Sequence, residues 1–454
     1  MTTLWSAEDL VLATAGRRRT AFAAEGVAID SRRLAPGDLF VALRDQRDGH
    51  DFVLDALQRG AAGAMVDHVP PGLPADAPLL VVGDTLAGLT ALGAYGRVRS
   101  GAKIIAVTGS VGKTSTKEML RVVLAGQTGV HAAEASYNNH WGVPLTLARL
   151  PADAGAAVIE IGMNHAGEIA PLARITRPHV AIITAIAPAH LGPLGSLEAI
   201  AREKAALLEG LLPEGVAILP AESAFLPRLL EFAGGRRVIT FGGAGEVPLL
   251  AFAGDALGSE VTTVIGGREI SFRLGVPGRH MAVNALAALA AVFASGFDPA
   301  AGAAALAGFA GLAGRGARRQ LRLPSGEIML IDESYNASPA SVRAALAVLG
   351  RHNGARRIAV LGDMLELGDA GPDEHAALAA EAAADADLVF TAGPLMAGLF
   401  AAIPAGSRGA HAPDSAALAP RLLARLRAGD VVLVKGSLGS RMSLVIDALA
   451  REAR

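Results

Sequence analysis

The chain has 454 residues, of which 52% are hydrophobic and 19% charged, so it can bury several apolar cores and is not intrinsically disordered. A formal net charge of -2 gives no overall basic surface, so we expect no nucleic-acid partner. The absence of cysteine excludes disulfides, thiolate metal sites and thiol nucleophiles.

No segment resembles a signal peptide or a membrane span. The N-terminal residues MTTLWSAEDL lack a basic region followed by an apolar stretch. The long uncharged run between Asn284 and Arg315 is interrupted by Asp298 and Pro299 and is rich in alanine and glycine, which favours buried helices. We therefore expect a cytoplasmic protein without membrane insertion.

The first predicted domain covers residues 1–100 and has an α/β pattern. Short apolar runs indicate strands at 38–43, 63–66 and 79–82, and a helical pattern covers 52–59.

The second predicted domain covers residues 101–312 and alternates strands with helices, which is typical of a parallel sheet covered by helices. Two alternating runs between Val261 and Leu274 flank Gly266-Gly267 and predict a β-hairpin, a small β excursion from the parallel sheet. The strands are expected at 103–107, 156–161, 180–183, 216–219 and 238–241.

The third predicted domain covers residues 313–454 and begins within a glycine-rich stretch at 308–316, a plausible linker; its pattern is Rossmann-like. Ligands of open α/β sheets bind at the carboxyl ends of the strands, so the loops after these strands are where chemistry is expected. The strands are expected at 327–331, 357–361, 387–391 and 431–434.

A glycine-rich motif follows the first strand of the second domain and precedes a helical pattern. Its backbone N–H groups and the helix N-terminus suit phosphate oxygens, Lys113 would reach the terminal phosphates of ATP, and the Thr114 hydroxyl would bind Mg²⁺. The spacing is shorter than in a general P-loop, because position 107 is Val107. The alternative is a chance Gly-Lys-Thr at a helix start. The predicted ATP-binding residues of this loop are Gly109, Ser110, Val111, Gly112, Lys113, Thr114 and Ser115.

This shortened loop, T-G-S-x-G-K-T, resembles that of the Mur ligase superfamily, which also contains folylpolyglutamate synthetase. Asn138 and Asn139, followed by Gly-Val-Pro-Leu-Thr, resemble a segment of this superfamily that contacts the substrate and Mg²⁺. An asparagine turn before a helix is the structural alternative.

Three further residues are candidates for metal binding. Glu160 stands in an otherwise apolar strand, where a carboxylate is costly unless it is paired or bound to a metal, so we expect it to bind Mg²⁺. The resemblance implies that His190 binds a second Mg²⁺ and that Lys204, fourteen residues later, assists as a carbamate. A structural histidine and a salt-bridged lysine are the alternatives.

The resemblance also implies nucleotide contacts outside the glycine loop. Asn284, in G-R-H-M-A-V-N-A, would face the adenine, and Arg315 would reach the ATP phosphates when the domains close. Asp332, Tyr335 and Asn336 lie in D-E-S-Y-N-A-S-P, which resembles the branch that adds D-alanyl-D-alanine. The loop G-D-M-L-E-L-G at 362–368 also matches this branch.

Substrate residues are expected in the first and third domains. Ser31 and Arg32 resemble the UDP-binding segment of the same branch, and an arginine beside a serine suits a diphosphate. Lys435, after the last strand, matches the expected position for contact with substrate.

The function implied by the resemblance is ATP-dependent ligation of D-alanyl-D-alanine to UDP-N-acetylmuramoyl-tripeptide through an acyl phosphate, with ATP and Mg²⁺. Lys113, Glu160, His190 and Lys204 are the expected catalytic residues. We expect a monomer that closes around ATP. The sequence identifies neither the third residue of the tripeptide, diaminopimelate or lysine, nor the general base for the amine.

Three other functions fit parts of the sequence. A ligase that adds diaminopimelate or lysine usually carries a D-N-P-R element, which is absent here, and a folylpolyglutamate synthetase leaves the first domain unexplained. A nucleotide-binding switch or kinase needs only the glycine loop and leaves Glu160, His190, Lys204 and Asp332 without a joint purpose.

Overall fold

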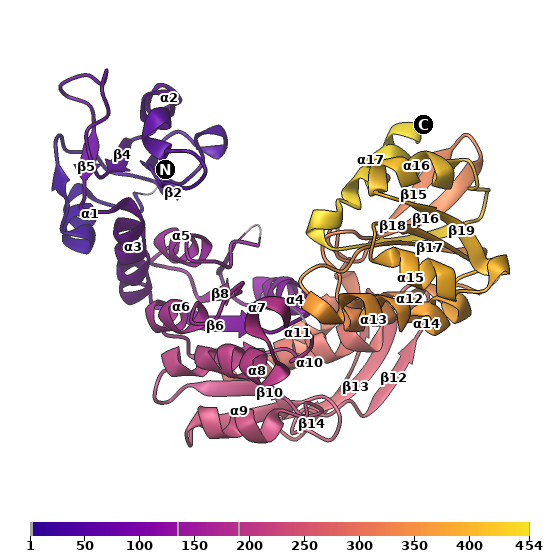
Figure 1. Cartoon of the computed structure of the whole chain (residues 1–454). Helices are drawn as coiled ribbons and strands as arrows, with labels where there is room; N and C mark the ends of the chain where they lie inside the picture. Colours follow the sequence, from indigo (N-terminus) through magenta and orange to yellow (C-terminus); the bar gives the residue numbers. More distant parts are fainter. Residues whose placement is uncertain (1–2, 134–135, 189–190, 354, 454) are drawn as a thin grey trace.

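The computed structural model describes residues 3–133, 136–188, 191–353 and 355–453. They form three α/β units, as predicted. The N-terminal unit and the C-terminal unit lie on opposite sides of the molecule, and the central unit lies below and between them (Figure 1). None of the helices in these ranges combines the length and apolar character needed to cross a membrane.

The N-terminal unit contains a sheet of order β1-β5-β4-β3-β2, in which only β1 is antiparallel to its neighbour. The strands predicted at 38–43, 63–66 and 79–82 are confirmed as β3, β4 and β5. The strands are β1 (Arg17–Arg18), β2 (Gly26–Ala28), β3 (Asp38–Val41), β4 (Gly63–Val66) and β5 (Leu79–Val81). The helices are α1 (Ala7–Thr14), η1 (Ser31–Arg33), η2 (Gly49–Phe52), α2 (Val53–Gln58) and α3 (Thr85–Arg99).

The central unit contains an all-parallel sheet of order β11-β10-β9-β6-β8-β7. The chain crosses from β8 on one side of β6 to β9 on the other, so the end of β6 is a topological switch point, where such sheets bind ligands. The strands are β6 (Lys103–Thr108), β7 (Val130–Ala132), β8 (Ala156–Glu160), β9 (Val180–Ile183), β10 (Val216–Pro220) and β11 (Arg237–Phe241).

Helices cover both faces of this sheet because the buried strands are apolar on both sides. One face packs on α4, α10 and α11, and the other on α5, α6, α8 and α9. The helices are α4 (Lys113–Ala125), α5 (Gly142–Ala148), α6 (Ile169–Thr176), α7 (Leu191–Leu194), α8 (Leu197–Ala205), η3 (Ala206–Gly210), α9 (Leu226–Ala233), α10 (Arg279–Ala294), α11 (Pro299–Ala305) and η4 (Leu306–Gly308).

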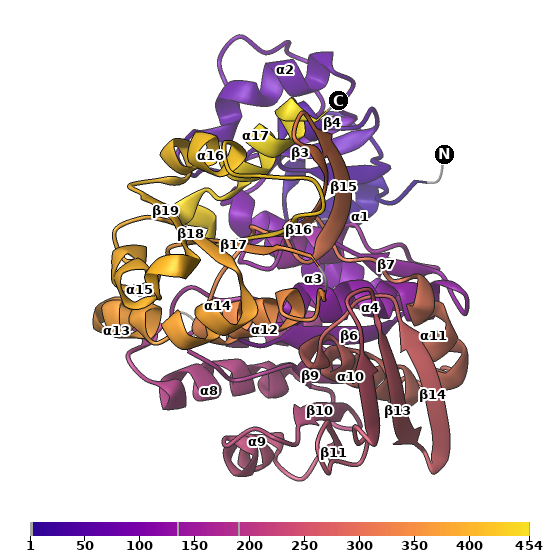
Figure 2. The same cartoon turned by 90° about the vertical axis from the view of Figure 1, so that its right-hand side faces the viewer.

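The predicted hairpin is confirmed as β13 (Ser259–Ile265) and β14 (Arg268–Leu274), with β12 (Ala251–Gly254) beside them in a separate antiparallel sheet. Gly266 and Gly267 form its turn at φ 59° and 79°. Left-handed backbone at two successive positions is what a two-residue hairpin turn requires, so glycine suits both. The hairpin lies along the edge of the central unit in Figure 2.

The C-terminal unit contains a sheet of order β15-β16-β20-β17-β18-β19, parallel except for the antiparallel pair β15 and β16. All four predicted strands are confirmed. The strands are β15 (Ala317–Leu323), β16 (Gly326–Glu333), β17 (Arg357–Gly362), β18 (Leu388–Ala392), β19 (Arg408–Ala412) and β20 (Val431–Lys435). The helices are α12 (Pro339–Leu349), η5 (Gly368–Ala370), α13 (Gly371–Ala376), α14 (Ala379–Asp385), α15 (Met396–Ala402), η6 (Ala405–Ser407), α16 (Ser415–Leu423), η7 (Leu438–Ser440) and α17 (Ser443–Glu452).

Candidate active site

The glycine loop joins the buried end of β6 to the start of α4. Gly109 and Gly112 have φ angles of 150° and 86°. A Cβ on Gly109 would lie 1.9 Å from Thr184 Oγ1, and one on Gly112 would lie 2.6 Å from Asn284 Oδ1. The loop is therefore packed too tightly for a side chain at either position, which leaves backbone N–H groups at its surface.

Residues after β9 hold this loop in place. The Thr184 hydroxyl lies 2.6 Å from the Val111 carbonyl oxygen, to which it donates, and the Ala187 N–H donates to Ser110 Oγ at 3.0 Å. Sequence reasoning missed Thr184, because its role depends on the neighbouring strand rather than on a motif. These two hydrogen bonds connect the loop to the segment after β9 and fix its conformation.

Lys113 begins α4 and bends back over the loop. Its Nζ donates to the Gly109 carbonyl oxygen at 2.7 Å. Burial lowers the pKa of the Lys113 ammonium, and the negative charges of Glu160 and Glu366 oppose this shift. A cation held here can contact phosphate oxygens that enter the loop.

Glu160 ends β8 beside the loop and is only 2% exposed. Its Oε1 accepts hydrogen bonds from Thr114 Oγ1 at 3.1 Å and Asn138 Nδ2 at 2.7 Å. Its Oε2 is buried and has no hydrogen-bond partner among the described residues. An orphaned carboxylate oxygen beside a threonine hydroxyl is a hard oxygen donor set that fits Mg²⁺.

These residues line a cavity of about 450 Å³ between the central and C-terminal units. It brings together most of the residues predicted from the sequence. Those lining it are Ser110, Val111, Gly112, Lys113, Thr114, Ser115, Asn138, Asn139, Glu160, Asn284, Arg315, Tyr335, Asn336 and Lys435.

The wall of this cavity formed by the C-terminal unit carries two positively charged side chains, those of Arg315 and Lys435. The Arg315 guanidinium lies 4.1 Å from the centre of the Tyr335 ring, a cation–π contact. Lys435 Nζ donates to Glu333 Oε2 at 3.2 Å and to the Asn336 carbonyl oxygen at 3.0 Å. Two positive side chains therefore face the glycine loop across the cavity, where they suit an anionic nucleotide.

Asp332 does not line the cavity, although the sequence placed it among the nucleotide contacts. Its Oδ2 accepts from the Gly314 N–H at 2.9 Å, and its Oδ1 accepts from the N–H and hydroxyl of Ser334. The carboxylate is buried within the protein, so it orients the Gly314-Arg315 turn.

The structure places only one of the two further predicted metal-binding residues, Lys204 and His190. Lys204, on α8, is 1% exposed and does not line the cavity. Burial lowers its pKa well below the ordinary value, and the charge of Lys113 acts in the same direction while Glu203 opposes it. The burial of Lys204 and the nearby charge of Lys113 therefore favour the neutral amine. His190 lies outside the described residues.

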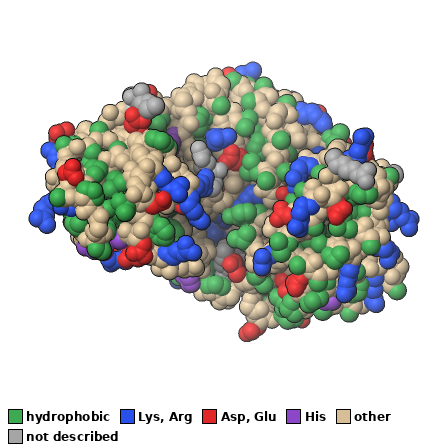
Figure 3. Space-filling view, turned by 90° about the horizontal axis from the view of Figure 1, so that it is seen from above, with side chains coloured by type: hydrophobic (Ala, Val, Ile, Leu, Met, Phe, Trp, Pro, Cys, Tyr) green, Lys and Arg blue, Asp and Glu red, His purple; other side chains and the backbone are tan. Residues whose placement is uncertain are grey.

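The predicted UDP-binding residues Ser31 and Arg32 lie on η1, away from this cavity. Arg32 folds back onto Asp30, with Nη2 to Oδ2 at 2.7 Å. Its neighbour Arg33, which the sequence did not single out, lines a second cavity of about 340 Å³ with Tyr137. Lysine and arginine side chains gather around the hollow between the N-terminal unit and the rest of the molecule (Figure 3).

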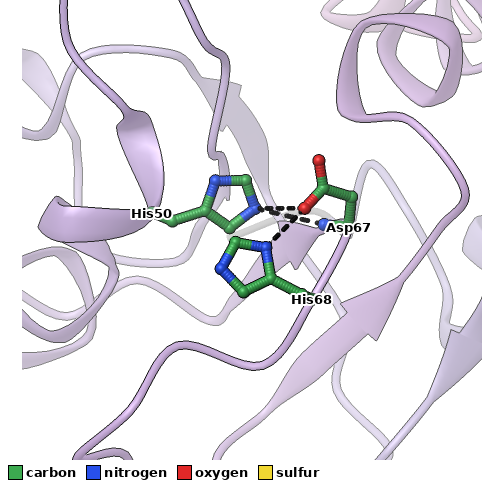
Figure 4. Close-up of side chains that lie close together, drawn as sticks. All are labelled: His50, Asp67 and His68. Atoms are coloured by element: carbon green, nitrogen blue, oxygen red, sulfur yellow. Dashed lines mark hydrogen bonds and ion pairs between the residues drawn. The ribbon is translucent and has the colours of Figure 1, made fainter.

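His50, Asp67 and His68 in the N-terminal unit lie close enough together to be considered for a metal site (Figure 4). The Asp67 N–H donates to His50 Nε2 at 3.2 Å, which occupies the lone pair that a metal needs. Arg44 Nη2 lies 3.0 Å from Asp67 Oδ1 and already supplies positive charge. We therefore assign this cluster a structural role.

Comparisons with known proteins agree with this geometry. Residues 107–292 match the family model "Mur ligase middle domain", and residues 317–438 match "Mur ligase, glutamate ligase domain". A glycine loop facing a Rossmann-like unit across a cavity defines a nucleotide-binding enzyme built from cooperating α/β units. The chain belongs to the Mur ligase family, which confirms the resemblance seen in the sequence.

Individual relatives are similar over almost the whole chain. The UDP-N-acetylmuramoyl-tripeptide–D-alanyl-D-alanine ligase of Bacillus subtilis is 35% identical over 431 residues, 93% of this chain and 92% of the relative. A crystal structure of MurF from Acinetobacter baumannii has a TM-score of 0.87 at 32% identity and covers 98% of this chain and 99% of that one. A structure of MurF from Thermotoga maritima in complex with ADP has a TM-score of 0.78 at 25% identity and covers 94% of this chain and 97% of that one.

Proposed function

We propose that the protein is an ATP-dependent ligase that joins D-alanyl-D-alanine to UDP-N-acetylmuramoyl-tripeptide. The observation that carries this proposal is the cavity in which the glycine loop, Lys113 and the buried Glu160 carboxylate face Arg315 and Lys435 of the C-terminal unit. The substrates are those in the names of relatives similar over most of the chain.

The chemistry follows from the leaving group. A free carboxylate does not acylate an amine at neutral pH, because oxide is too poor a leaving group. Transfer of the γ-phosphoryl group of ATP to the tripeptide carboxylate gives an acyl phosphate, from which phosphate departs when the amine attacks. The protein must therefore hold the phosphates, neutralise charge and align two substrates.

Each part of the cavity has a task in this reaction. The loop amides and Lys113 bind the phosphate oxygens and stabilise the charge that spreads over the transferring group. Arg315 and Lys435 add positive charge from the other wall. Asn284, whose amide lies against Gly112, and Tyr335 lie where they can contact the nucleotide.

Glu160 and Thr114 are the residues that would hold Mg²⁺, with Asn138 orienting the carboxylate. When bound, the ion supplies positive charge that makes the phosphoryl group more electrophilic. We further propose that Lys204, whose neutral form is favoured by burial, reacts with carbon dioxide and that its carbamate joins His190 in holding a second ion.

The N-terminal unit is proposed to bind the UDP part of the substrate through Ser31 and Arg32, with the second cavity nearby. ATP and UDP-linked precursors are cytoplasmic metabolites, so we propose that the protein acts there. The domain limits at 100/101 and 312/313, a monomeric state and the lack of a nucleic-acid partner remain predictions.

The decisive measurement is phosphate release from ATP with purified protein. We expect release to require both the UDP-muramoyl tripeptide and D-alanyl-D-alanine, with diaminopimelate- and lysine-containing tripeptides tested in parallel. Phosphate release with neither substrate present would instead support a nucleotide-binding switch that hydrolyses ATP, and ADP formation without phosphate release would support a kinase.

Lys113→Ala tests the glycine loop within this assay. We expect ligation to fall by about 10²–10³-fold or more, because charge on the transferring phosphoryl group loses its principal cation. Lys103→Ala is the control, since Lys103 is exposed at the start of β6, and it should ligate like the unaltered protein. Thermal unfolding of both variants checks the fold, and undiminished ligation by folded Lys113→Ala contradicts the proposal.

A further inference from the structure

Glu203, on α8, is a buried carboxylate that the proposed reaction does not use. It is 8% exposed. Its Oε2 accepts from the Gly167 N–H at 2.8 Å, and its Oε1 accepts from the Ile169 N–H at 2.9 Å. Burial of a carboxylate is costly unless it is hydrogen-bonded, and both oxygens of this one are bonded to the same short segment. Glu203 therefore anchors the turn after β8, residues 163–168, and the start of α6.

Helix α6 is thus capped from another helix. Ile169 is its first residue, and the first N–H groups of a helix have no partner within the helix. A serine, threonine, aspartate or asparagine at the N-cap position is the usual local solution. The residue at that position is Glu168, and its side chain makes no capping hydrogen bond. The capping carboxylate comes from Glu203 instead.

The Glu168 side chain turns back toward the cavity. Its Oε2 accepts from the Asn164 N–H at 2.7 Å, and its Oε1 lies 3.2 Å from His165 Nδ1. Gly167 has a φ angle of 86°, a left-handed conformation that glycine adopts readily. The turn after β8 is therefore closed on itself by Glu168 and fixed to α8 by the buried carboxylate.

This turn forms part of the wall of the nucleotide cavity. Asn164 and Glu168 line the cavity together with Glu160, the residue proposed to hold Mg²⁺. The Gly162 N–H, just before the turn, donates to the Asn138 carbonyl oxygen at 2.8 Å. The turn therefore lies beside the place where the phosphoryl group would be transferred.

The same part of the wall leads to the N-terminal unit. Tyr137 lines the second cavity with Arg33, whereas the next two residues, Asn138 and Asn139, line the nucleotide cavity. This short segment joins the two cavities. A substrate with its UDP part in the N-terminal unit and its carboxyl end at the phosphoryl group would run along it, beside the turn after β8. The exposed Asn164 amide can both donate and accept, so it suits the peptide groups of such a substrate.

We propose that Glu203 is a positioning residue for the ligation, which acts through Glu168 to present Asn164 to the peptide of the UDP-muramoyl tripeptide. This inference rests on the proposed function. Glu203 precedes Lys204 in the chain, so α8 carries both the lysine proposed to become a carbamate and the anchor of the substrate wall.

Glu203→Gln tests the proposal in the ligation assay. The glutamine amide has a single acceptor oxygen, and its NH₂ group would face an N–H donor, so one hydrogen bond to the turn is lost. We expect the KM for the UDP-muramoyl tripeptide to rise about tenfold or more, the effect of one hydrogen bond to a charged group. The KM values for ATP and D-alanyl-D-alanine should stay unchanged, whereas a general loss of structure would move all three.

Glu168→Gln and the double variant show whether Glu203 acts through Glu168. Each single change should raise the KM for the tripeptide. The double variant should raise it no further than the larger single effect, because changes along one chain of contacts are not additive.

Glu209→Gln is the matched control. The Glu209 carboxylate also bonds α6 from outside, with its Oε2 2.7 Å from Arg174 Nη2, but this pair is exposed and does not line the cavity. All three KM values should match those of the unaltered protein.

An unchanged KM for the tripeptide in folded Glu203→Gln overturns the inference. Equal rises in all three KM values overturn it as well, and so do additive effects in the double variant. If Glu203→Gln does not fold, Asn164→Ala takes its place, because Asn164 is exposed, and an unchanged KM for the tripeptide again overturns the inference. If the unaltered protein does not ligate, the proposed function itself fails.

Discussion

Thr184 gives the phosphate loop its shape although no motif marks it. Its hydroxyl donates to the Val111 carbonyl oxygen, and its side chain fills the space beside Gly109. The glycine loop and Glu160 were predictable from local sequence patterns, and Lys435 was predicted from the resemblance to the Mur ligase superfamily. Thr184 and Arg33 were not predictable in this way, because only the packing of distant segments gives them a role.

Thr184→Val tests this bracing. The substitution keeps the shape of the side chain and removes its hydrogen bond, so we expect about tenfold weaker ATP binding, equivalent to roughly 1.4 kcal/mol. Isothermal titration with an ATP analogue measures the change. Thr263→Val is the control: the Thr263 hydroxyl is buried without a partner among the described residues, so its loss should leave binding unchanged.

His179 predicts a pH dependence of stability. The Ile104 N–H donates to His179 Nδ1 at 2.9 Å, which requires a neutral imidazole. Burial, aided by the positive charges of Arg97 and Lys103, lowers the pKa of His179 to about 4. Between the ordinary histidine pKa of about 6.5 and 4, the unfolded chain binds a proton that the folded protein does not, so stability falls as the pH falls.

We expect this histidine to account for about 1 kcal/mol of stability lost between pH 7 and pH 4.5, allowing for its partial exposure. Urea unfolding at both pH values, compared with His179→Asn, isolates the effect, since the asparagine does not titrate. Equal losses in the two proteins would show that other groups dominate.

At the scale of elements, the sequence predicted the strands that are apolar and central. It missed β1, β2, β7, β12, β15 and β19, all of which lie at the edge of a sheet, because these strands are short or carry polar residues. β15, with arginines at 318, 319 and 322, is the clearest case. Its partner β16 is buried and was found.

The hairpin turn allows a test of backbone conformation. Gly267 has a φ angle of 79° and open space where a side chain would begin, so Gly267→Ala should cost about 1 kcal/mol through conformation alone. Gly101 has equally open space and an ordinary φ angle, so Gly101→Ala should leave stability unchanged or raise it slightly. Urea unfolding of the two variants makes the comparison, and equal stabilities would contradict the assigned turn.

At the scale of the whole molecule, the N-terminal unit is tied closely to the central unit. Helix α3 packs closely on α5 through two glycines. A Cβ on Gly93 would lie 2.8 Å from the Pro144 carbonyl oxygen, and a Cβ on Gly96 would lie 2.4 Å from the Leu147 carbonyl oxygen. The C-terminal unit instead faces the glycine loop across the cavity. The movable part is therefore expected to be the C-terminal unit.

We predict that an ATP analogue together with the UDP-muramoyl tripeptide closes this cavity and reduces the radius of gyration measured by small-angle scattering. Arg315 and Lys435 then approach the phosphates bound to the loop. Lys113→Ala should show a smaller change at the same ligand concentrations, because it binds ATP more weakly. Unchanged dimensions of the unaltered protein at saturation would count against closure.

The sequence by itself determined the order of the three α/β units, the glycine loop and the residues that flank it, because strand periodicity and a phosphate-binding turn are local properties of the chain. Only the tertiary structure decided that Glu160 has one oxygen without a hydrogen-bond partner among the described residues, and that Asp332 faces inward. Those facts depend on which segments meet in space. The distances between these side chains, and their burial from water, are set only when the sheets and helices pack together.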